Sequence, residues 1–121
     1  ADRAQPSTLS VEAGRLVETN SAATFAGGMA VRMPVQEAFD IYSKGAERII
    51  PVTDDEVADA IRLYFTATHN VAEGAGAAPL AGLMQERAAM QGKRVGVILC
   101  GGNIDTAWFA QVLAGTTPQV S

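Results

Sequence analysis

The residues best suited to chemistry form the run Cys100–Gly101–Gly102–Asn103, which follows the apolar stretch RVGVIL. Two adjacent glycines allow a sharp turn, while a thiol and an amide can both form hydrogen bonds to a ligand. The run is too short for a GxGxxG fingerprint and lacks the lysine of a phosphate-binding P-loop. Two interpretations therefore remain open from these residues alone: a turn after a buried strand, or part of a ligand site.

Other polar residues have simple structural explanations. Glu73, in VAEGAGAA, is placed to interact favourably with the positive end of a helix dipole, a role that is compatible with a place in a site. His69 lies just beyond a predicted helix, where we expect a structural or solvated side chain. The acidic residues after Thr53 are interpreted as cap and solvent-facing residues: Asp54, Asp55 and Asp59.

The elements that must position these residues follow an α/β pattern. RVGVILC (94–100) is typical of a strand covered on both faces, and RIIPVT (48–53) predicts a short strand at an edge or strand end because of Pro51. Ligands of open α/β sheets bind beyond the carboxyl ends of the strands, where the CGGN run would lie. Helices are predicted at 34–45, after the TDDE capping box at 53–56, at 75–90 and at 105–115, the last with Trp108, Phe109, Val112 and Leu113 facing inward.

Length and composition limit the classes of protein. The 121 residues fit one α/β domain or fragment, 1–121, with an irregular lead-in at 1–24. The net charge of −4 and the scattered basic residues argue against nucleic acid or an anionic membrane as partners. A single cysteine and a single histidine make an internal disulfide or a closed metal site improbable, and no signal-peptide pattern opens the sequence, so we expect a cytoplasmic protein without a metal.

Four motifs in order resemble the carboxyl-terminal part of the threonine and serine dehydratases, which are fold-type II pyridoxal-phosphate enzymes. The motifs are SVEAGRLVETNSAATFAGGMAVR, VTDDEVADAIRLYF, NVAEGAGAAPLAGLM and VGVILCGGNID. The resemblance covers nearly the whole chain. It implies a partial three-layer α/β/α unit from the large domain of these enzymes.

The resemblance also assigns cofactor-binding roles. Cys100 matches a Ser or Cys whose side chain hydrogen-bonds the pyridine nitrogen of pyridoxal phosphate, a weaker partner than a carboxylate, which suits elimination from a β-hydroxy amino acid. Gly101 and Gly102 leave room for the ring, Asn103 fixes the loop, and Glu73 lies near the ring. Gly27 departs from the pattern, because FAGG stands where the family has FADG.

The Schiff-base lysine and the glycine-rich phosphate loop of the family belong upstream of this segment, and Lys44 and Lys93 lie in neither context. We therefore expect no catalytic residue in this chain, no activity and no tight cofactor binding by the chain alone. The expected partners are the amino-terminal half that carries the lysine, further copies of the chain, and a small amino-acid substrate. A racemase within the family and a stand-alone, non-catalytic module for oligomerisation or metabolite binding remain as alternatives.

Overall fold

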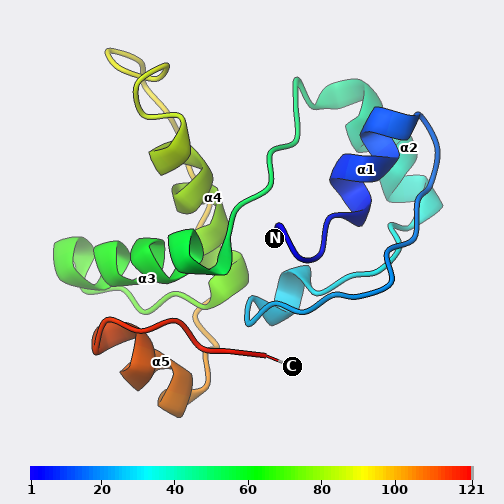
Figure 1. The fold of residues 1–121 in the computed structure, drawn as a ribbon. Coiled ribbons are helices and arrows are strands. Elements are labelled where there is room, and N and C mark those ends of the chain that lie inside the picture. Colours follow the sequence, from blue (N-terminus) through cyan, green and yellow to red (C-terminus); the bar gives the residue numbers. More distant parts are fainter. Residues whose placement is uncertain (121) are drawn as a thin grey trace.

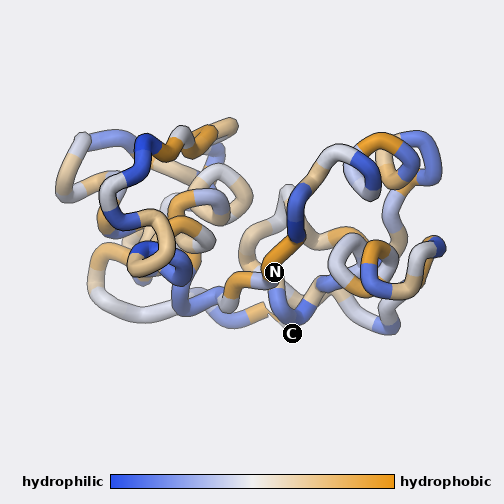
Figure 2. The backbone as a smooth tube through the Cα atoms, turned by 90° about the horizontal axis from the view of Figure 1, so that it is seen from above, coloured by the Kyte–Doolittle hydropathy of each residue, from blue (hydrophilic) through white to orange (hydrophobic). Residues whose placement is uncertain are grey.

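The computed structural model describes residues 1–120, in which all regular elements are helical (Figure 1). They are α1 (Pro6–Ala13), the 3-10 helix η1 (Gly27–Met29), α2 (Gln36–Gly45), α3 (Asp54–Thr68), α4 (Gly74–Gln85) and α5 (Thr106–Leu113). Helix α3 packs on α4 and α5, α1 packs on α2, and η1 contacts α4. In Figures 1 and 2, both views place the α1–α2 pair and the α3–α4–α5 group on opposite sides of the chain termini.

Helix α3 forms where its local signals predict it. The Thr53 hydroxyl accepts a hydrogen bond from the Glu56 N–H (3.1 Å), and the Glu56 carboxylate accepts one from the Thr53 N–H (2.8 Å). This capping box satisfies two backbone donors that would otherwise lack partners. At the other end His69 adopts a left-handed conformation (φ 56°) and its N–H bonds back to Phe65, which ends the helix as predicted.

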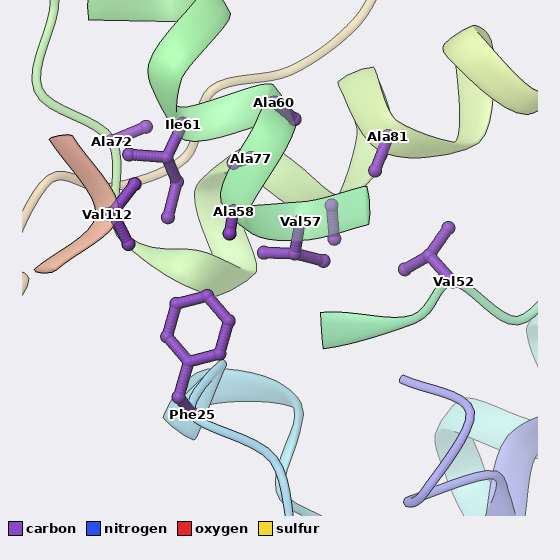
Figure 3. Close-up of a cluster of buried hydrophobic side chains, with 11 residues drawn as sticks. Phe25, Val52, Val57, Ala58, Ala60, Ile61, Ala72, Ala77, Ala81 and Val112 are labelled. Atoms are coloured by element: carbon purple, nitrogen blue, oxygen red, sulfur yellow. The ribbon is translucent and has the colours of Figure 1, made fainter. Parts of the chain in front are cut away.

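The hydrophobic core lies between α3, α4 and α5 (Figure 3). Val57 and Ile61 of α3 and Val112 of α5 are fully buried, because their spacing puts them on the inner faces of their helices. Small side chains on the facing surface of α4 allow α3 and α4 to pack closely: Ala77, Ala78 and Ala81. Phe25 enters this core from the segment before η1.

The two predicted strands are not formed within residues 1–120, so the α/β layering expected from the sequence is not present there. Residues 48–53 and 94–100 run without regular structure, and no backbone hydrogen bond joins 94–100 to another described segment. A strand requires a neighbour for its N–H and C=O groups, and neither run pairs with the other. Both runs therefore have the composition of strands without the pairing.

The lead-in at 1–24, which we predicted to be irregular, contains α1. Pro6 at the first helical position and Gly14 in the left-handed conformation (φ 68°) define its two ends. The segment is anchored by Asp54, whose carboxylate accepts hydrogen bonds from Arg3 (2.7 Å) and Thr24 (2.5 Å). Asp54 is only 6% exposed, so its prediction as a solvent-facing residue was wrong, whereas Asp55 and Asp59 are exposed.

Several predicted boundaries differ from those observed. Helix α2 begins at Gln36 rather than Pro34, and α4 ends at Gln85 although its pattern continues to Met90. Leu113 is 42% exposed and does not face the core, unlike Val112 beside it. Residue 121 lies outside the described residues.

Candidate functional site

The candidate site lies where three segments meet at glycines. A Cβ atom added at Gly74 would lie 2.6 Å from Ala26 Cα, and one added at Gly76 would meet the carbonyl oxygen of Gly101 inside 3.0 Å. Real Cβ atoms essentially never approach other atoms so closely, and here the obstacles are backbone atoms that cannot rotate away. Glycine is therefore required for the segment before η1, the start of α4 and the CGGN run to come together.

Glu73 is the polar residue at the centre of this contact. Its N–H donates a hydrogen bond to the Gly101 carbonyl (3.0 Å), which ties the start of α4 to the CGGN run. Its side chain lies beside Gly101, where an added Cβ would come within 2.7 Å of Glu73 Oε1. The carboxylate does not cap α4 and accepts no hydrogen bond from a described residue, which leaves both oxygens available to a ligand.

A cavity of about 120 Å³ opens at this meeting point. Its polar side chains are those of Glu73, Asn103 and Asp105, and Gly27 and Gly28 line it from the opposite segment. One oxygen of Asp105, Oδ1, accepts hydrogen bonds from the Ala107 N–H (2.9 Å) and the Trp108 N–H (3.1 Å) at the start of α5. Glu73, Asn103 and the second oxygen of Asp105 therefore remain able to bind a polar ligand.

The aromatic part of the cavity wall is a pair of rings from different segments. Phe25 and Trp108 pack edge to face with ring centroids 6.2 Å apart. Both residues line the cavity, and Phe25 is 3% exposed. Because Trp108 is only partly buried, this pair forms an apolar wall that remains partly accessible from the cavity.

The structure brings together most, but not all, of the residues predicted from the sequence. Glu73, Gly101 and Asn103 meet as described, and Gly102 belongs to the same turn, packed so closely on the Val71 carbonyl that a Cβ would lie 2.5 Å from it. Cys100 is exposed and does not line the cavity, although the neighbouring Gly101 lies against Glu73.

The remaining candidates lie elsewhere. His69 is exposed at the end of α3. Lys44 and Lys93 are exposed and do not line the cavity. Sequence reasoning missed Gly28, Asp105 and Trp108 as site residues, although the FAGG motif could have indicated the first of them.

Two general properties bear on the possible functions of residues 1–120. No helix in this range combines the length and the apolar character needed to cross a membrane. Across the same residues, no group of three or more His, Cys, Asp or Glu side chains is arranged to hold a metal ion.

Comparison with known proteins identifies a family. The family described as "Pyridoxal-phosphate dependent enzyme" matches residues 1–101. L-threonine ammonia-lyase of Thermotoga maritima is 32% identical over 104 residues, which are 86% of this chain and 26% of the relative. Phenylserine dehydratase of Ralstonia pickettii is 37% identical over 108 residues, which are 86% of this chain and 32% of the relative. The chain thus spans about a quarter to a third of the length of these relatives.

Solved structures agree with the sequence comparison. The processed form of threonine deaminase isoform 2 from Solanum lycopersicum superposes with a TM-score of 0.83 and 27% identity, covering 93% of this chain and 34% of that one. The threonine deaminase from T.th. gives a TM-score of 0.75 and 30% identity, covering 86% of this chain and 38% of that one. The chain therefore belongs to the pyridoxal-phosphate dependent enzymes, as a threonine dehydratase-like member of fold type II.

Proposed function

We propose that this chain is the carboxyl-terminal part of the large domain of an ammonia-lyase that converts a β-hydroxy amino acid to a 2-oxo acid and ammonia. The observation that carries the proposal is that Glu73 and Asn103 line one cavity, with Gly101 packed against Glu73, in a member of this family. Relatives named for threonine, phenylserine and hydroxyaspartate support a β-hydroxy amino acid as the substrate class.

The residues of the CGGN turn fit one side of the cofactor. The exposed Cys100 thiol is free to donate a hydrogen bond to the pyridine nitrogen, and a thiol is too weak an acid to protonate that nitrogen fully. The absence of side chains at Gly101 and Gly102 lets the turn pack directly against the Glu73 carboxylate and the Val71 carbonyl, which holds the carboxylate beside the turn. Asn103 lines the cavity next to this turn, where its amide can bind a polar group of the ligand. Pyridoxal phosphate, when bound, supplies the electron sink that lets the substrate lose its α-proton and then its β-hydroxyl.

The size of the cavity supports a site completed by another part of the enzyme. Its volume of about 120 Å³ is well below the roughly 300–1,000 Å³ of ordinary ligand pockets. The amino groups of Lys44 and Lys93 lie outside it. We infer that the Schiff-base lysine comes from an amino-terminal portion and that the 121-residue chain alone is inactive.

The same inference extends to the architecture. With the amino-terminal portion in place, 48–53 and 94–100 become strands of a three-layer α/β/α unit, and residues 1–121 form part of one domain. We further propose that the complete enzyme is a cytoplasmic homo-oligomer.

The test is reconstitution with the missing portion. The chain is co-expressed with the segment of the Thermotoga maritima relative that precedes the matched region, and the purified pair is assayed for cofactor absorbance and for 2-oxo acid formed from L-threonine and L-serine. We expect both signals with the pair and neither with the chain alone. Formation of D-serine without 2-oxo acid would instead identify a racemase.

Matched glycine variants separate the site from general stability. Gly101→Ala puts a methyl group within 2.7 Å of Glu73 Oε1, whereas Gly96→Ala meets no atom within 4 Å. Loss of cofactor absorbance in Gly101→Ala alone supports the proposal. A colourless, inactive pair, or a chain that binds the cofactor and turns over unaided, contradicts it.

A further inference from the structure

Asp54, the first residue of α3, is a buried carboxylate that has no part in the proposed function. Each of its oxygens has one partner: Oδ2 accepts a hydrogen bond from the Arg3 guanidinium (2.7 Å), and Oδ1 accepts one from the Thr24 hydroxyl (2.5 Å). A buried charge without partners would be costly, and hydrogen bonds to a charged group are the strong ones. The two bonds therefore fix both the position and the orientation of the carboxylate.

The Thr24 hydroxyl continues this chain of hydrogen bonds toward the candidate site. While it donates to Asp54, it also accepts a hydrogen bond from the Ala26 N–H (3.1 Å). Thr24 and Ala26 are both buried, with exposed fractions of 4% and 0%. A hydroxyl that donates to one group and accepts from another is held in one rotamer, so it ties the backbone at Ala26 to the start of α3.

Residues 25–28 are the part of the cavity wall that follows Thr24. Three of them line the cavity: Phe25, Gly27 and Gly28. Phe25 also points toward the core side chains of α3 and α4 (Figure 3). Ala26 lies against α4, because a Cβ added at Gly74 would be 2.6 Å from Ala26 Cα. Since Gly74 directly follows Glu73, a shift of Ala26 would change the distance between this wall and the Glu73 carboxylate.

The bond to Asp54 is the one by which this wall reaches a distant segment. Within residues 1–120, the other hydrogen bonds of 24–28 join residues at most three positions apart. Such local bonds shape the turn at η1, but they do not determine where the turn lies relative to α3 and α4. That position depends on apolar packing and on the Thr24–Asp54 bond.

We propose that Asp54 is a positioning residue for the candidate site, which through Thr24 fixes the 25–28 wall of the cavity against the start of α4. Asp54 does not line the cavity and acts only through the residues that do. Sites depend on such supporting hydrogen bonds, because a wall that moves by a fraction of an ångström no longer fits its ligand. The part of the proposal that concerns the cofactor rests on the proposed function.

Quenching of Trp108 fluorescence by acrylamide tests the effect on the cavity in the chain alone. Trp108, the only tryptophan, lines the cavity and packs edge to face on Phe25. Thr24→Val keeps nearly the same shape but removes the hydroxyl. We expect the quenching constant to rise, because Phe25 is no longer held against the indole ring. Thr24→Ser keeps the hydroxyl and should retain the quenching constant of the wild type.

Thr53→Ala separates positioning from general stability. The Thr53 hydroxyl caps the same end of α3 through the Glu56 N–H (3.1 Å), and Thr53 does not line the cavity. Quenching is measured where circular dichroism shows that every variant is folded. Thr53→Ala should leave the quenching constant unchanged. Equal constants for Thr24→Val and Thr53→Ala would overturn the proposal.

Asp54→Ala tests the same link from the carboxylate, and it takes the place of Thr24→Val if that variant does not fold. It should raise the quenching constant in the same way. The double variant should show little further increase, because both substitutions break one link. Fully additive increases would mean that the two residues act on the cavity separately, which contradicts the proposed chain of hydrogen bonds.

Cofactor binding by the reconstituted pair tests the consequence for function. The chain is paired with the preceding segment of the Thermotoga maritima relative, and the dissociation constant of pyridoxal phosphate is measured by absorbance. Thr24→Val should raise this constant about tenfold, the equivalent of one hydrogen bond to a charged group, whereas Thr24→Ser and Thr53→Ala should not change it. An unchanged constant for Thr24→Val refutes the positioning role. If the wild-type pair binds no cofactor but the quenching differences appear, the proposed function fails and the effect of Asp54 on the cavity stands.

Discussion

Replacement of Gly76 by alanine tests the contact on which the candidate site depends. In a helix interior this change normally stabilises by about 0.5–1 kcal/mol, because alanine has the higher helix propensity. Here the new Cβ would lie inside 3.0 Å of the Gly101 carbonyl oxygen, which also accepts the hydrogen bond from the Glu73 N–H. Relief of the clash must move the CGGN turn away from α4.

The free-energy cost of the clash is expected to exceed the gain in helix propensity. Overpacking costs about 1–3 kcal/mol, and the lost hydrogen bond adds about 1 kcal/mol. When the gain from the higher helix propensity of alanine is subtracted, Gly76→Ala should lower the free energy of unfolding by about 1–3 kcal/mol. The control is Gly82→Ala in the same helix, whose Cβ would meet Ile50 Cδ1 at an ordinary 3.5 Å, and which should stabilise by about 0.5–1 kcal/mol.

Urea unfolding followed by fluorescence provides the assay. Trp108, the only tryptophan, lines the cavity and packs on Phe25, so its emission reports on the site itself. Opposite shifts of the unfolding midpoint for the two variants are expected. Equal stabilisation by Gly76→Ala and Gly82→Ala would refute the claim that the start of α4 and the CGGN turn are in contact.

Three further predictions concern other parts of the chain. Thr53→Ala removes the capping hydroxyl that accepts from the Glu56 N–H and should lower the free energy of unfolding by about 1 kcal/mol, measured by far-ultraviolet circular dichroism. The hydrogen bond from Arg48 holds the pKa of Glu86 below its ordinary value. The ion pair therefore stabilises the fold above the pKa that Glu86 has in the unfolded chain, and this stabilisation is lost as the pH falls through the pKa that Glu86 has in the folded chain. The difference in unfolding free energy between wild type and Glu86→Gln should be present at neutral pH and vanish in acid. Cys100 is exposed, so Cys100→Asp should change the stability of the isolated chain by less than about 0.5 kcal/mol in a thermal melt, and a large loss would mean that the thiol is buried.

Local signals predicted the helices better than the strands. The capping box at Thr53 and Glu56 is completed within four residues, so α3 could be predicted from its own sequence. The run 94–100 has the composition of a buried strand, but a strand exists only with a neighbour, and no such neighbour lies within residues 1–120. Helix α1 was missed although Pro6 and Gly14 mark its ends.

Only part of the candidate site could be predicted, because the remaining residues reach it through contacts between distant segments. The resemblance named Glu73, Gly101 and Asn103, and the structure places them together. Local patterns could not indicate Trp108 as a wall of the cavity, because its contact with Phe25 joins segments far apart in the chain. The burial of Asp54 was missed likewise, since its partners Arg3 and Thr24 precede it by long stretches of sequence.

The glycine contacts also have a consequence for the order of folding. Helices α3 and α4 are neighbours in sequence and can pair early, whereas the contacts of Ala26 with Gly74 and of Gly76 with Gly101 must close long loops first. The cavity is therefore expected to be among the last parts of the chain to assemble. A nascent chain would present a finished helical hairpin well before the residues around Glu73 acquired their neighbours.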